Sequence, residues 1–311
     1  MKKCLIIDDL HDCIIPLLEE AGYAVDYRPG LSRSEVLTGI ADYEGLIVRS
    51  KLAVDRELID AALKLRFVGR AGAGLDQLDV EALTARNIAI LNAPEGNRDA
   101  LAEHLVGMLL SLLNHISRAD RQVRAGTWDR EGNRGTELMG KTIGLVGYGY
   151  MGQAFAQRLS GFGVTVLAYD KYRRDYTDRY ATEATMHELH ERAEVLSFHV
   201  PLTEETHHLV DKSYLDRFQN DIYLLNSARG KIMTLGTLSE AIARGKVRGA
   251  ALDVLETEPP ARMTPDQRRY FDELAQSDRV LLTPHVGGWT HESYEKISRV
   301  LARKIIALNR E

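Results

Sequence analysis

The sequence predicts an α/β protein of two domains, each a doubly wound parallel sheet with helices on both faces. Short apolar runs of strand length alternate along the chain with longer segments of helical periodicity, which is the pattern of repeated strand–helix–strand units. A glycine-rich turn joins one such run to a helical segment near the middle of the chain. The length of 311 residues favours two domains over one.

The first domain is expected to contain five short strands, with a long helix after them. The strands are predicted at residues 4–8, 24–27, 46–49, 67–69 and 88–91. A capping pattern, Ser32-x-x-Glu35, begins one of the helices between them. After a turn at residues 92–97, an amphipathic helix is predicted for residues 98–121, and an irregular arm containing Trp128 follows it.

The strands of the second domain begin at residues 142–146. Further strands are predicted at residues 164–169, 195–198, 222–225, 247–252 and 280–282, and a last helix at residues 291–309. We place the domain boundaries so that residues 1–95 and 286–311 form one domain and residues 96–285 form the other.

The segment Leu145-Val-Gly-Tyr-Gly-Tyr-Met-Gly152 predicts a dinucleotide site, because its glycines follow a strand and open a helix. Gly147 permits the tight turn, and Gly149 lets the backbone approach a pyrophosphate. Gly152 allows the helix and strand to pack closely, so that the phosphates lie at the helix N-terminus.

Asp170 closes the next apolar run and is expected to bind the adenosine ribose. An acid roughly 20 residues after the glycine turn accepts hydrogen bonds from the 2′-hydroxyl and repels a 2′-phosphate, so NAD is favoured over NADP. The basic residues Lys171, Arg173 and Arg174 weaken this preference slightly.

Composition and charge indicate a soluble enzyme, with 44% hydrophobic and 27% charged residues and a net charge of −5. No basic run indicates nucleic acid or an anionic membrane as a partner, and the longest apolar helix stretch, residues 105–113, is too short to span a bilayer. The N-terminus predicts a first strand and no secretion signal, so we expect a cytoplasmic protein. Cys4 and Cys13 are expected to be reduced. No metal site is predicted, because His187 and His190 are three residues apart where the zinc motif needs four.

The acidic pair Asp8 and Asp9 after the first strand resembles the magnesium-binding pair of a response-regulator receiver domain. A receiver domain needs a phosphoacceptor aspartate at the end of its third strand, and this chain has Arg49 and Ser50 there. We therefore reject that interpretation and expect both acids to be loop residues at a strand end.

Three residues that could carry chemistry each follow a strand of the second domain: Arg229, Glu258 and His285. Ligands in open α/β sheets bind outside the carboxyl ends of the strands, so one site could hold all three. His285 suits a general base that takes the hydroxyl proton during oxidation of an alcohol. Glu258 would fix the imidazole tautomer, and Arg229 would bind a substrate carboxylate through its planar fork.

Seven ordered segments, spread over essentially the whole chain, make it similar to the NAD-dependent D-isomer-specific 2-hydroxyacid dehydrogenases. They are Gly45-Leu-Ile-Val-Arg-Ser50, Val68-Gly-Arg-Ala-Gly-Ala-Gly-Leu-Asp76, Gly140-Lys-Thr-Ile-Gly-Leu-Val-Gly-Tyr-Gly149, His199-Val-Pro-Leu-Thr203, Asn226-Ser-Ala-Arg-Gly230, Ala251-Leu-Asp-Val-Leu-Glu256 and Thr283-Pro-His285. The resemblance implies a flavodoxin-like substrate domain and a Rossmann NAD-binding domain, with Arg229, Glu258 and His285 as the catalytic set. It also implies further cofactor contacts at Tyr150, Met151, Val200, Pro201, Ser227 and Asp253.

Within the family, the members that oxidise phosphoglycerate are the most similar, and the resemblance then implies a short form without a C-terminal regulatory domain. The expected reaction is D-3-phosphoglycerate to 3-phosphohydroxypyruvate, the entry to serine biosynthesis. Arg49 and Ser50 would bind the phosphate, while the backbone amides of Ala73 and Gly74 would help to bind the carboxylate. Glu95, where an asparagine is expected, and the bulky Trp289 depart from the family pattern and leave the substrate open.

Two alternatives remain open at this point. One is a glyoxylate or hydroxypyruvate reductase of the same family, and the other is an NADH-sensing binding protein of the corepressor kind. We also expect a homodimer paired through the NAD-binding domain, because the helix predicted at residues 98–121 and the arm with Trp128 are too apolar to stand free, although burial within one chain is an alternative.

Overall fold

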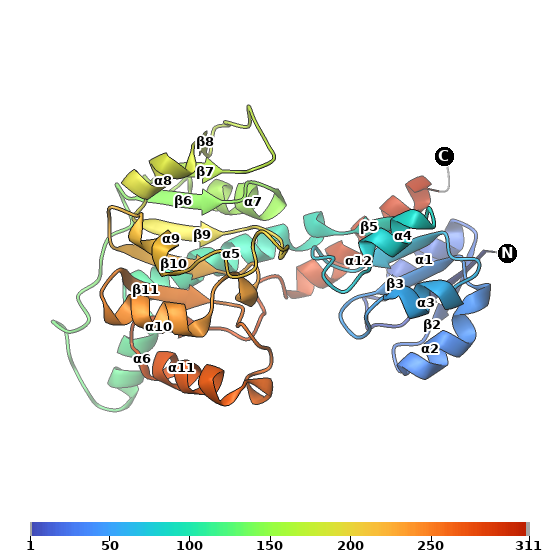
Figure 1. Cartoon of the computed structure of the whole chain (residues 1–311), viewed down its shortest axis with the longest axis horizontal. Helices are drawn as coiled ribbons and strands as arrows, with labels where there is room; N and C mark the ends of the chain where they lie inside the picture. The colour runs from blue at the N-terminus through green and yellow to red at the C-terminus, as the bar shows by residue number, and fades with distance from the viewer. Residues whose placement is uncertain (1, 309–311) are drawn as a thin grey trace. The chain divides into compact units, whose positions relative to one another are not determined.

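The structure is a computed structural model that describes residues 2–308 of the chain. It divides into two compact units, one formed by Met1–Arg98 with Trp289–Glu311 and the other by Asp99–Gly288. The long helix α5 (Pro94–Leu113) crosses the boundary between them. Figure 1 shows both units and labels most of their helices and strands.

The first unit is built on a five-stranded parallel sheet with the strand order β2-β1-β3-β4-β5. This is the flavodoxin-like order, in which the strand order has its switch point between β1 and β3. The elements are β1 (Lys2–Ile6), α1 (Ile14–Glu20), β2 (Tyr23–Tyr27), α2 (Arg33–Gly39), η1 (Ile40–Asp42), β3 (Gly45–Val48), α3 (Arg56–Ala61), β4 (Phe67–Arg70), α4 (Val80–Ala85), β5 (Ala89–Asn92) and α12 (His291–Leu308).

Alternation along the strands gives this sheet two cores. In β1, Leu5 packs into the core beneath α2, α3 and α4, whereas Cys4 and Ile6 pack on the other face with α1 and α12. Successive strand side chains point to opposite faces, so a strand covered on both sides reads as a continuous apolar run. The predicted capping box is present at α2, where Ser32 and Glu35 bond to each other's backbone amides.

The second unit is built on a seven-stranded parallel sheet with the order β12-β11-β10-β9-β6-β7-β8. The order in which strands are added switches from one side of β6 to the other between β6 and β9, as in dinucleotide-binding sheets. The elements are α6 (Ile116–Arg124), β6 (Thr142–Val146), α7 (Tyr150–Leu159), β7 (Thr165–Tyr169), β8 (Thr182–Glu183), α8 (Met186–Arg192), β9 (Val195–Phe198), α9 (Lys212–Asp216), β10 (Ile222–Asn226), η2 (Gly230–Ile232), α10 (Leu235–Ala243), β11 (Val247–Leu252), η3 (Pro260–Arg262), α11 (Pro265–Gln276) and β12 (Val280–Leu282).

Two cores again lie on opposite faces of the sheet. One contains apolar residues of α8, α9, α10 and α11, and the other contains residues of α5 and α7. In β10, Leu224 belongs to the first core and Leu225 to the second. The predicted α/β class with two doubly wound parallel sheets is therefore confirmed.

The single helix predicted for residues 98–121 is wrong in its extent. The structure has two helices, α5 and α6, which are bent by 62° at a short break. His115 adopts a left-handed backbone conformation with φ of 54°, which interrupts the helix before α6. The two-residue strand β8 was also not predicted, and Asn309, the predicted end of the last helix, lies outside the described residues.

In the part of the chain that the structure describes, no single helix has both the length and the apolar character needed to cross a membrane. The bent pair α5 and α6 meets that test only when the two are taken together. Cys4 and Cys13 are both free thiols.

Candidate functional site

The glycine turn between β6 and α7 has the geometry that a dinucleotide site requires. Gly147 has a φ of +98°, and a side chain there would meet the carbonyl oxygen of His199 at 2.8 Å. A side chain at Gly152 would meet the carbonyl oxygen of Gly147 at 2.4 Å. Both positions are therefore restricted to glycine by close packing.

Gly149 differs, because a Cβ built on it meets no atom of the described residues within 4 Å. It is the N-cap of α7 and makes no side-chain cap, so the first backbone amides of this ten-residue helix are left for another acceptor. These amides and the open space at Gly149 fit a pyrophosphate. Tyr150 and Met151, at which the resemblance implies cofactor contacts, lie in the first turn of the same helix.

Asp170 follows β7 and contacts the glycine turn directly. Its Oδ2 accepts a hydrogen bond from the backbone amide of Tyr148 at 2.9 Å, and its Oδ1 accepts from the amides of Tyr172 at 3.0 Å and Arg173 at 3.2 Å. The carboxylate therefore holds the turn between β6 and α7 against the end of β7.

The basic residues after Asp170 already have partners. Lys171 donates to Oε1 of Glu205 at 2.6 Å, and Nη1 of Arg174 donates to the backbone carbonyl of Arg173 at 2.7 Å. Arg173 donates to the carbonyl oxygen of Tyr148. Of the three, Lys171 is paired with an acid, whereas Arg173 and Arg174 bond to neutral backbone carbonyls.

The other residues expected at the cofactor lie at the carboxyl ends of β9 and β10. Val200 and Pro201 follow β9, and Val200 lies beside the glycine turn, 3.1 Å from a Cβ built on Gly147. Ser227 follows β10 and is 5% exposed, and its hydroxyl oxygen has no hydrogen-bond partner among the described residues. An unsatisfied buried hydroxyl at this position fits a polar ligand group.

His285 and Glu258 form a hydrogen-bonded pair in the second unit. Nδ1 of His285 lies 2.8 Å from Oε2 of Glu258, while Oε1 of Glu258 accepts the backbone amide of Leu255 at 2.9 Å. The hydrogen bond to Glu258 raises the pKa of His285, although partial burial opposes this. Burial works to raise the pKa of Glu258, but hydrogen bonds from His285 and Leu255 bring it below its usual value.

The direction of this hydrogen bond fixes the imidazole tautomer. The carboxylate of Glu258 can only accept, so Nδ1 of His285 carries the proton of the bond. Nε2 is then the ring nitrogen that can exchange a proton with a ligand. Both side chains remain partly exposed, at 52% for His285 and 36% for Glu258.

The turn that carries Arg229 packs against the loop that carries Glu258, and the positive charge of Arg229 acts to lower the pKa of His285. The turn that carries it is held by Asn226, whose side chain accepts from the amide of Ala228 and donates to the carbonyl of Arg229, both at 3.0 Å. Gly230 packs so closely that a Cβ there would lie 1.9 Å from the carbonyl oxygen of Leu255. The turns carrying Arg229 and Glu258 are thus in direct contact.

Asp253, expected at the cofactor, uses its carboxylate to hold the loop that carries His285. It accepts hydrogen bonds from the hydroxyl of Thr283 at 2.6 Å and from the backbone amides of Val286 at 2.9 Å and Gly287 at 2.8 Å. It is 1% exposed, and burial tends to raise its pKa, but the nearby His104 and these hydrogen bonds keep the pKa below its usual value. Nε2 of His104 on α5 contacts the same Thr283 hydroxyl at 3.1 Å.

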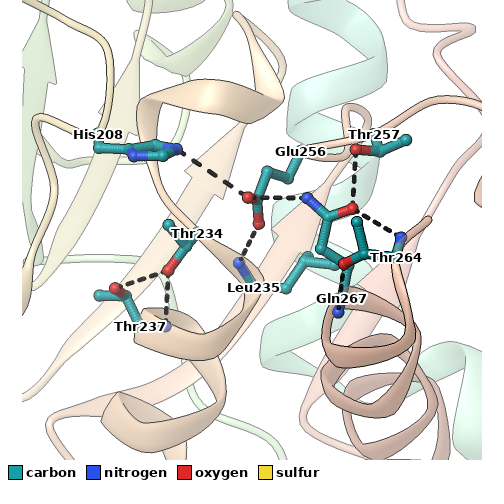
Figure 2. A network of polar contacts seen from close by, with 8 residues as sticks. All are labelled: His208, Thr234, Leu235, Thr237, Glu256, Thr257, Thr264 and Gln267. Atoms are coloured by element: carbon teal, nitrogen blue, oxygen red, sulfur yellow. Dashed lines mark hydrogen bonds and ion pairs between the residues drawn. The ribbon is translucent and has the colours of Figure 1, made fainter.

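A polar network around Glu256 fixes the loop that carries Glu258 (Figure 2). Glu256 accepts from the backbone amide of Leu235 at the start of α10 and from the side chain of Gln267 on α11, both at 3.0 Å. Gln267 in turn accepts from the hydroxyl of Thr257 at 3.0 Å and from the amide of Thr264. The loop is therefore tied to the first turns of two helices.

Arg49 and Ser50 follow β3 in the first unit, next to Asp8 after β1. The order in which strands are added to the sheet switches from one side of β1 to the other between β1 and β3. Such a switch point is where open α/β sheets bind ligands. Oδ2 of Asp8 accepts the backbone amide of Arg49 at 2.6 Å. Asp8 lies in the loop after β1, as predicted, and at 7% exposed it is buried there.

Ala73 and Gly74 lie in the turn after β4. The carbonyl oxygen of Ala73 accepts from the side chain of Asn92 at 2.7 Å, and neither backbone amide has an acceptor among the described residues. Glu95, at the first turn of α5, accepts from Nζ of Lys304 at 2.9 Å. Its negative charge is therefore paired within the first unit.

Several supporting residues were not identified from the sequence. Asn226 and Glu256 lie inside segments that carried the family resemblance, but nothing in their spacing indicated what they bind. His104 is separated from Thr283 by 179 positions, so no local pattern connects them. Burial of a polar side chain next to a predicted catalytic turn is the signal that finds them, and it requires the structure.

Comparison with known proteins gives consistent relatives. The family model for the NAD-binding domain of D-isomer specific 2-hydroxyacid dehydrogenases matches residues 106–287. D-3-phosphoglycerate dehydrogenase of Methanocaldococcus jannaschii is 36% identical over 98% of this chain and 57% of that protein, and hydroxypyruvate reductase of Thermotoga maritima is 35% identical over 88% of each chain. The crystal structure of a glyoxylate reductase from Paecilomyes thermophila has a TM-score of 0.87 at 25% identity and covers 98% of this chain and 94% of its own.

The chain spans 57% of the length of the phosphoglycerate dehydrogenase that it matches and 88% of the hydroxypyruvate reductase. The family model covers more than half of the chain, and it ends at residue 287, just beyond His285. The chain belongs to the D-isomer specific 2-hydroxyacid dehydrogenase family, and its second unit contains the NAD-binding domain of that family.

Proposed function

We propose that the protein is an NAD-dependent dehydrogenase of a D-2-hydroxy acid, with His285, Glu258 and Arg229 as its catalytic residues. The observation that carries this proposal is the hydrogen bond of 2.8 Å between His285 and Glu258 at the carboxyl ends of a dinucleotide-binding sheet. Arg229 supplies a positive charge beside this pair.

The reaction separates a hydride from a proton. NAD, when bound at the glycine turn, supplies the hydride acceptor for oxidation of the alcohol. Nε2 of His285 takes the hydroxyl proton, and the Glu258 carboxylate stabilises the imidazolium that forms. Arg229 binds the substrate carboxylate in a bidentate manner, which orients the reacting carbon. In the reverse direction the imidazolium returns its proton to the carbonyl oxygen.

For the substrate we propose D-3-phosphoglycerate, oxidised to 3-phosphohydroxypyruvate in serine biosynthesis, with Arg49 and Ser50 at the phosphate and Ala73 and Gly74 at the carboxylate. Two observations support this. Arg49 lies at the switch point of the first sheet, and Glu95, whose charge would oppose a phosphate, is paired with Lys304. Each charge-assisted bond to the phosphate contributes roughly 1.5 to 3 kcal/mol.

A reductase of hydroxypyruvate or glyoxylate is the second candidate, and the relative from Thermotoga maritima favours it. The first candidate in its reverse direction and the second both reduce a 2-oxo acid. They are therefore separated by comparing kcat/KM for 3-phosphohydroxypyruvate and hydroxypyruvate, with the loss of NADH absorbance as the readout. We expect a preference for the phosphorylated acid that Arg49→Ala removes. Equal values in the wild-type protein would assign the unphosphorylated substrate, and no turnover of any 2-oxo acid would support an NADH-sensing binding protein.

We also propose a cytoplasmic homodimer that pairs through α6 and the arm after it. Large apolar side chains are exposed there in one chain: Ile116 and Val123 at 53%, Met139 at 73% and Trp128 at 78%. Several large apolar side chains exposed along one segment support an interface there. Light scattering at micromolar concentration should give twice the mass of 34.8 kDa, and Trp128→Asp should shift it toward the monomer. A monomeric wild-type protein would refute the pairing.

A further inference from the structure

Trp289 and Arg49 are in close contact within the first unit, although 240 positions separate them. Cζ of Arg49 lies 3.6 Å from the ring centroid of Trp289, the shortest contact of its kind among the described residues. This equals the contact distance of two carbon atoms, roughly 3.5–4.0 Å. An N–H group pointing at the ring would hold Cζ farther away, so the guanidinium lies flat on the indole.

The ring of Trp289 is itself held in place. Tyr294 packs edge-on against it, with centroids 5.4 Å apart and an interplanar angle of 75°. The backbone beside it is fixed where α12 begins, because Thr290 and Ser293 exchange hydrogen bonds of 2.9 and 3.0 Å between side chains and amides. Burial and the nearby Asp9 raise the pKa of Tyr294 to about 12, so the phenol stays neutral. Trp289 is therefore a fixed platform.

The edge of Arg49 is left for another group. Its face covers the indole, and the N–H donors of a guanidinium lie in its plane, so they point sideways from the stack. The side chain is half-buried, and no acceptor for these donors exists among the described residues. Burial lowers the pKa of Arg49 while Asp8 and Asp9 act in the opposite direction. A desolvated cation with unused donors is the chemistry of an anion site.

We propose that Trp289 is a specificity-determining residue, which holds Arg49 flat so that the guanidinium edge binds a second anionic group of the substrate. That group is a phosphate or a carboxylate remote from the reacting carbon. This inference rests on the proposed dehydrogenase activity. Stacking restricts the rotamers of Arg49 before the substrate arrives, which lowers the entropic cost of binding. It also keeps the cation from turning toward Asp8 and Asp9, whose carboxylates would neutralise it.

The kinetic test compares Trp289→Leu and Trp289→Phe with the wild-type protein. The substrates are 3-phosphohydroxypyruvate, 2-oxoglutarate and hydroxypyruvate, in which the second anionic group is a phosphate, a carboxylate and absent, respectively. We expect Trp289→Leu to lower kcat/KM for the preferred dianionic acid by about three- to thirtyfold, the range of a partly desolvated cation–π contact, with hydroxypyruvate changed less than about twofold. Trp289→Phe should lie between. An equal loss on all three acids, or no loss, would overturn the proposal.

A binding test needs no turnover and so separates this inference from the proposed function. The chain contains two tryptophans, so Trp128→Phe leaves Trp289 as the sole indole fluorophore. Titrating this variant with 3-phosphoglycerate, without nucleotide, should change the emission in a saturable way, whereas glycerate should not. Adding Arg49→Ala should remove the change. A response that glycerate reproduces, or that survives Arg49→Ala, would contradict the anion site. Failure of all 2-oxo acids to turn over would instead refute the proposed function.

Discussion

Nδ1 of His285 lies 2.8 Å from Oε2 of Glu258, and this contact decides which ring nitrogen can exchange a proton. Glu258 also accepts a hydrogen bond from the backbone amide of Leu255, which holds its carboxylate in place beside the imidazole. Asp253 holds the backbone directly after His285 through the amides of Val286 and Gly287. The position of His285 therefore depends on two acids with different partners.

Replacing Glu258 by Gln should shift the pH dependence of the reaction. The hydrogen bond to Glu258 raises the pKa of His285, so the neutral amide should let that pKa fall. Reduction of a 2-oxo acid needs the protonated imidazole, and its rate therefore falls as pH rises through the pKa of His285. The fall should occur at lower pH in Glu258→Gln than in the wild-type protein. Profiles with the same midpoint would show that Glu258 does not control the protonation of His285.

Gly230→Ala should destabilise the protein and impair catalysis together. An added Cβ would lie 1.9 Å from the carbonyl oxygen of Leu255, so the turns that carry Arg229 and Glu258 would have to separate. Overpacking of this kind costs about 1–3 kcal/mol in the free energy of unfolding. Gly161→Ala is the matched control, because a Cβ there meets no described atom within 4 Å. Denaturant unfolding measures both variants, and equal stability would disprove the close contact.

Asp170 should make the enzyme prefer NAD to NADP. Its carboxylate repels a 2′-phosphate, and Lys171 is bound to Glu205 at 2.6 Å and so is drawn away from one. Asp170→Asn should reduce the ratio of kcat/KM with NAD to kcat/KM with NADP, mainly by lowering kcat/KM with NAD. Its second effect is on the glycine turn, since Asn can accept fewer of the three amide bonds. A wild-type protein that uses both cofactors equally would contradict the assignment.

The alternation of strands and helices was predictable because each strand is covered on both faces. The predicted strands at residues 142–146, 195–198, 247–252 and 280–282 coincide with β6, β9, β11 and β12. The break between α5 and α6 was not predicted, although the mainly apolar α5 is followed by a polar α6 with no buried residue. It coincides with His115, whose left-handed conformation is uncommon for residues other than glycine and has no signature in the residue spacing.

The residues that support the candidate site could not be predicted for a different reason. Glycine turns and residues at strand ends have local signatures, so Gly147, Asp170 and His285 were recognisable. The carboxylate of Asp253 binds amides 33 and 34 positions away, and Arg49 contacts Trp289 across 240 positions. Such contacts follow from how loops meet at a sheet edge, which residue spacing does not record. Trp289 was recognised as a departure from the family, but its partner was not.

The measurement that tests the central claim most directly is the kinetics of His285→Ala with NADH binding measured on the same preparation. Acid–base catalysis contributes about 10²- to 10⁴-fold, so kcat should fall by that factor in both directions. The dissociation constant for NADH should stay within about twofold, because the glycine turn and Asp170 are separate from the imidazole. A variant that keeps the wild-type kcat would contradict the assignment of His285 as the proton-transferring residue.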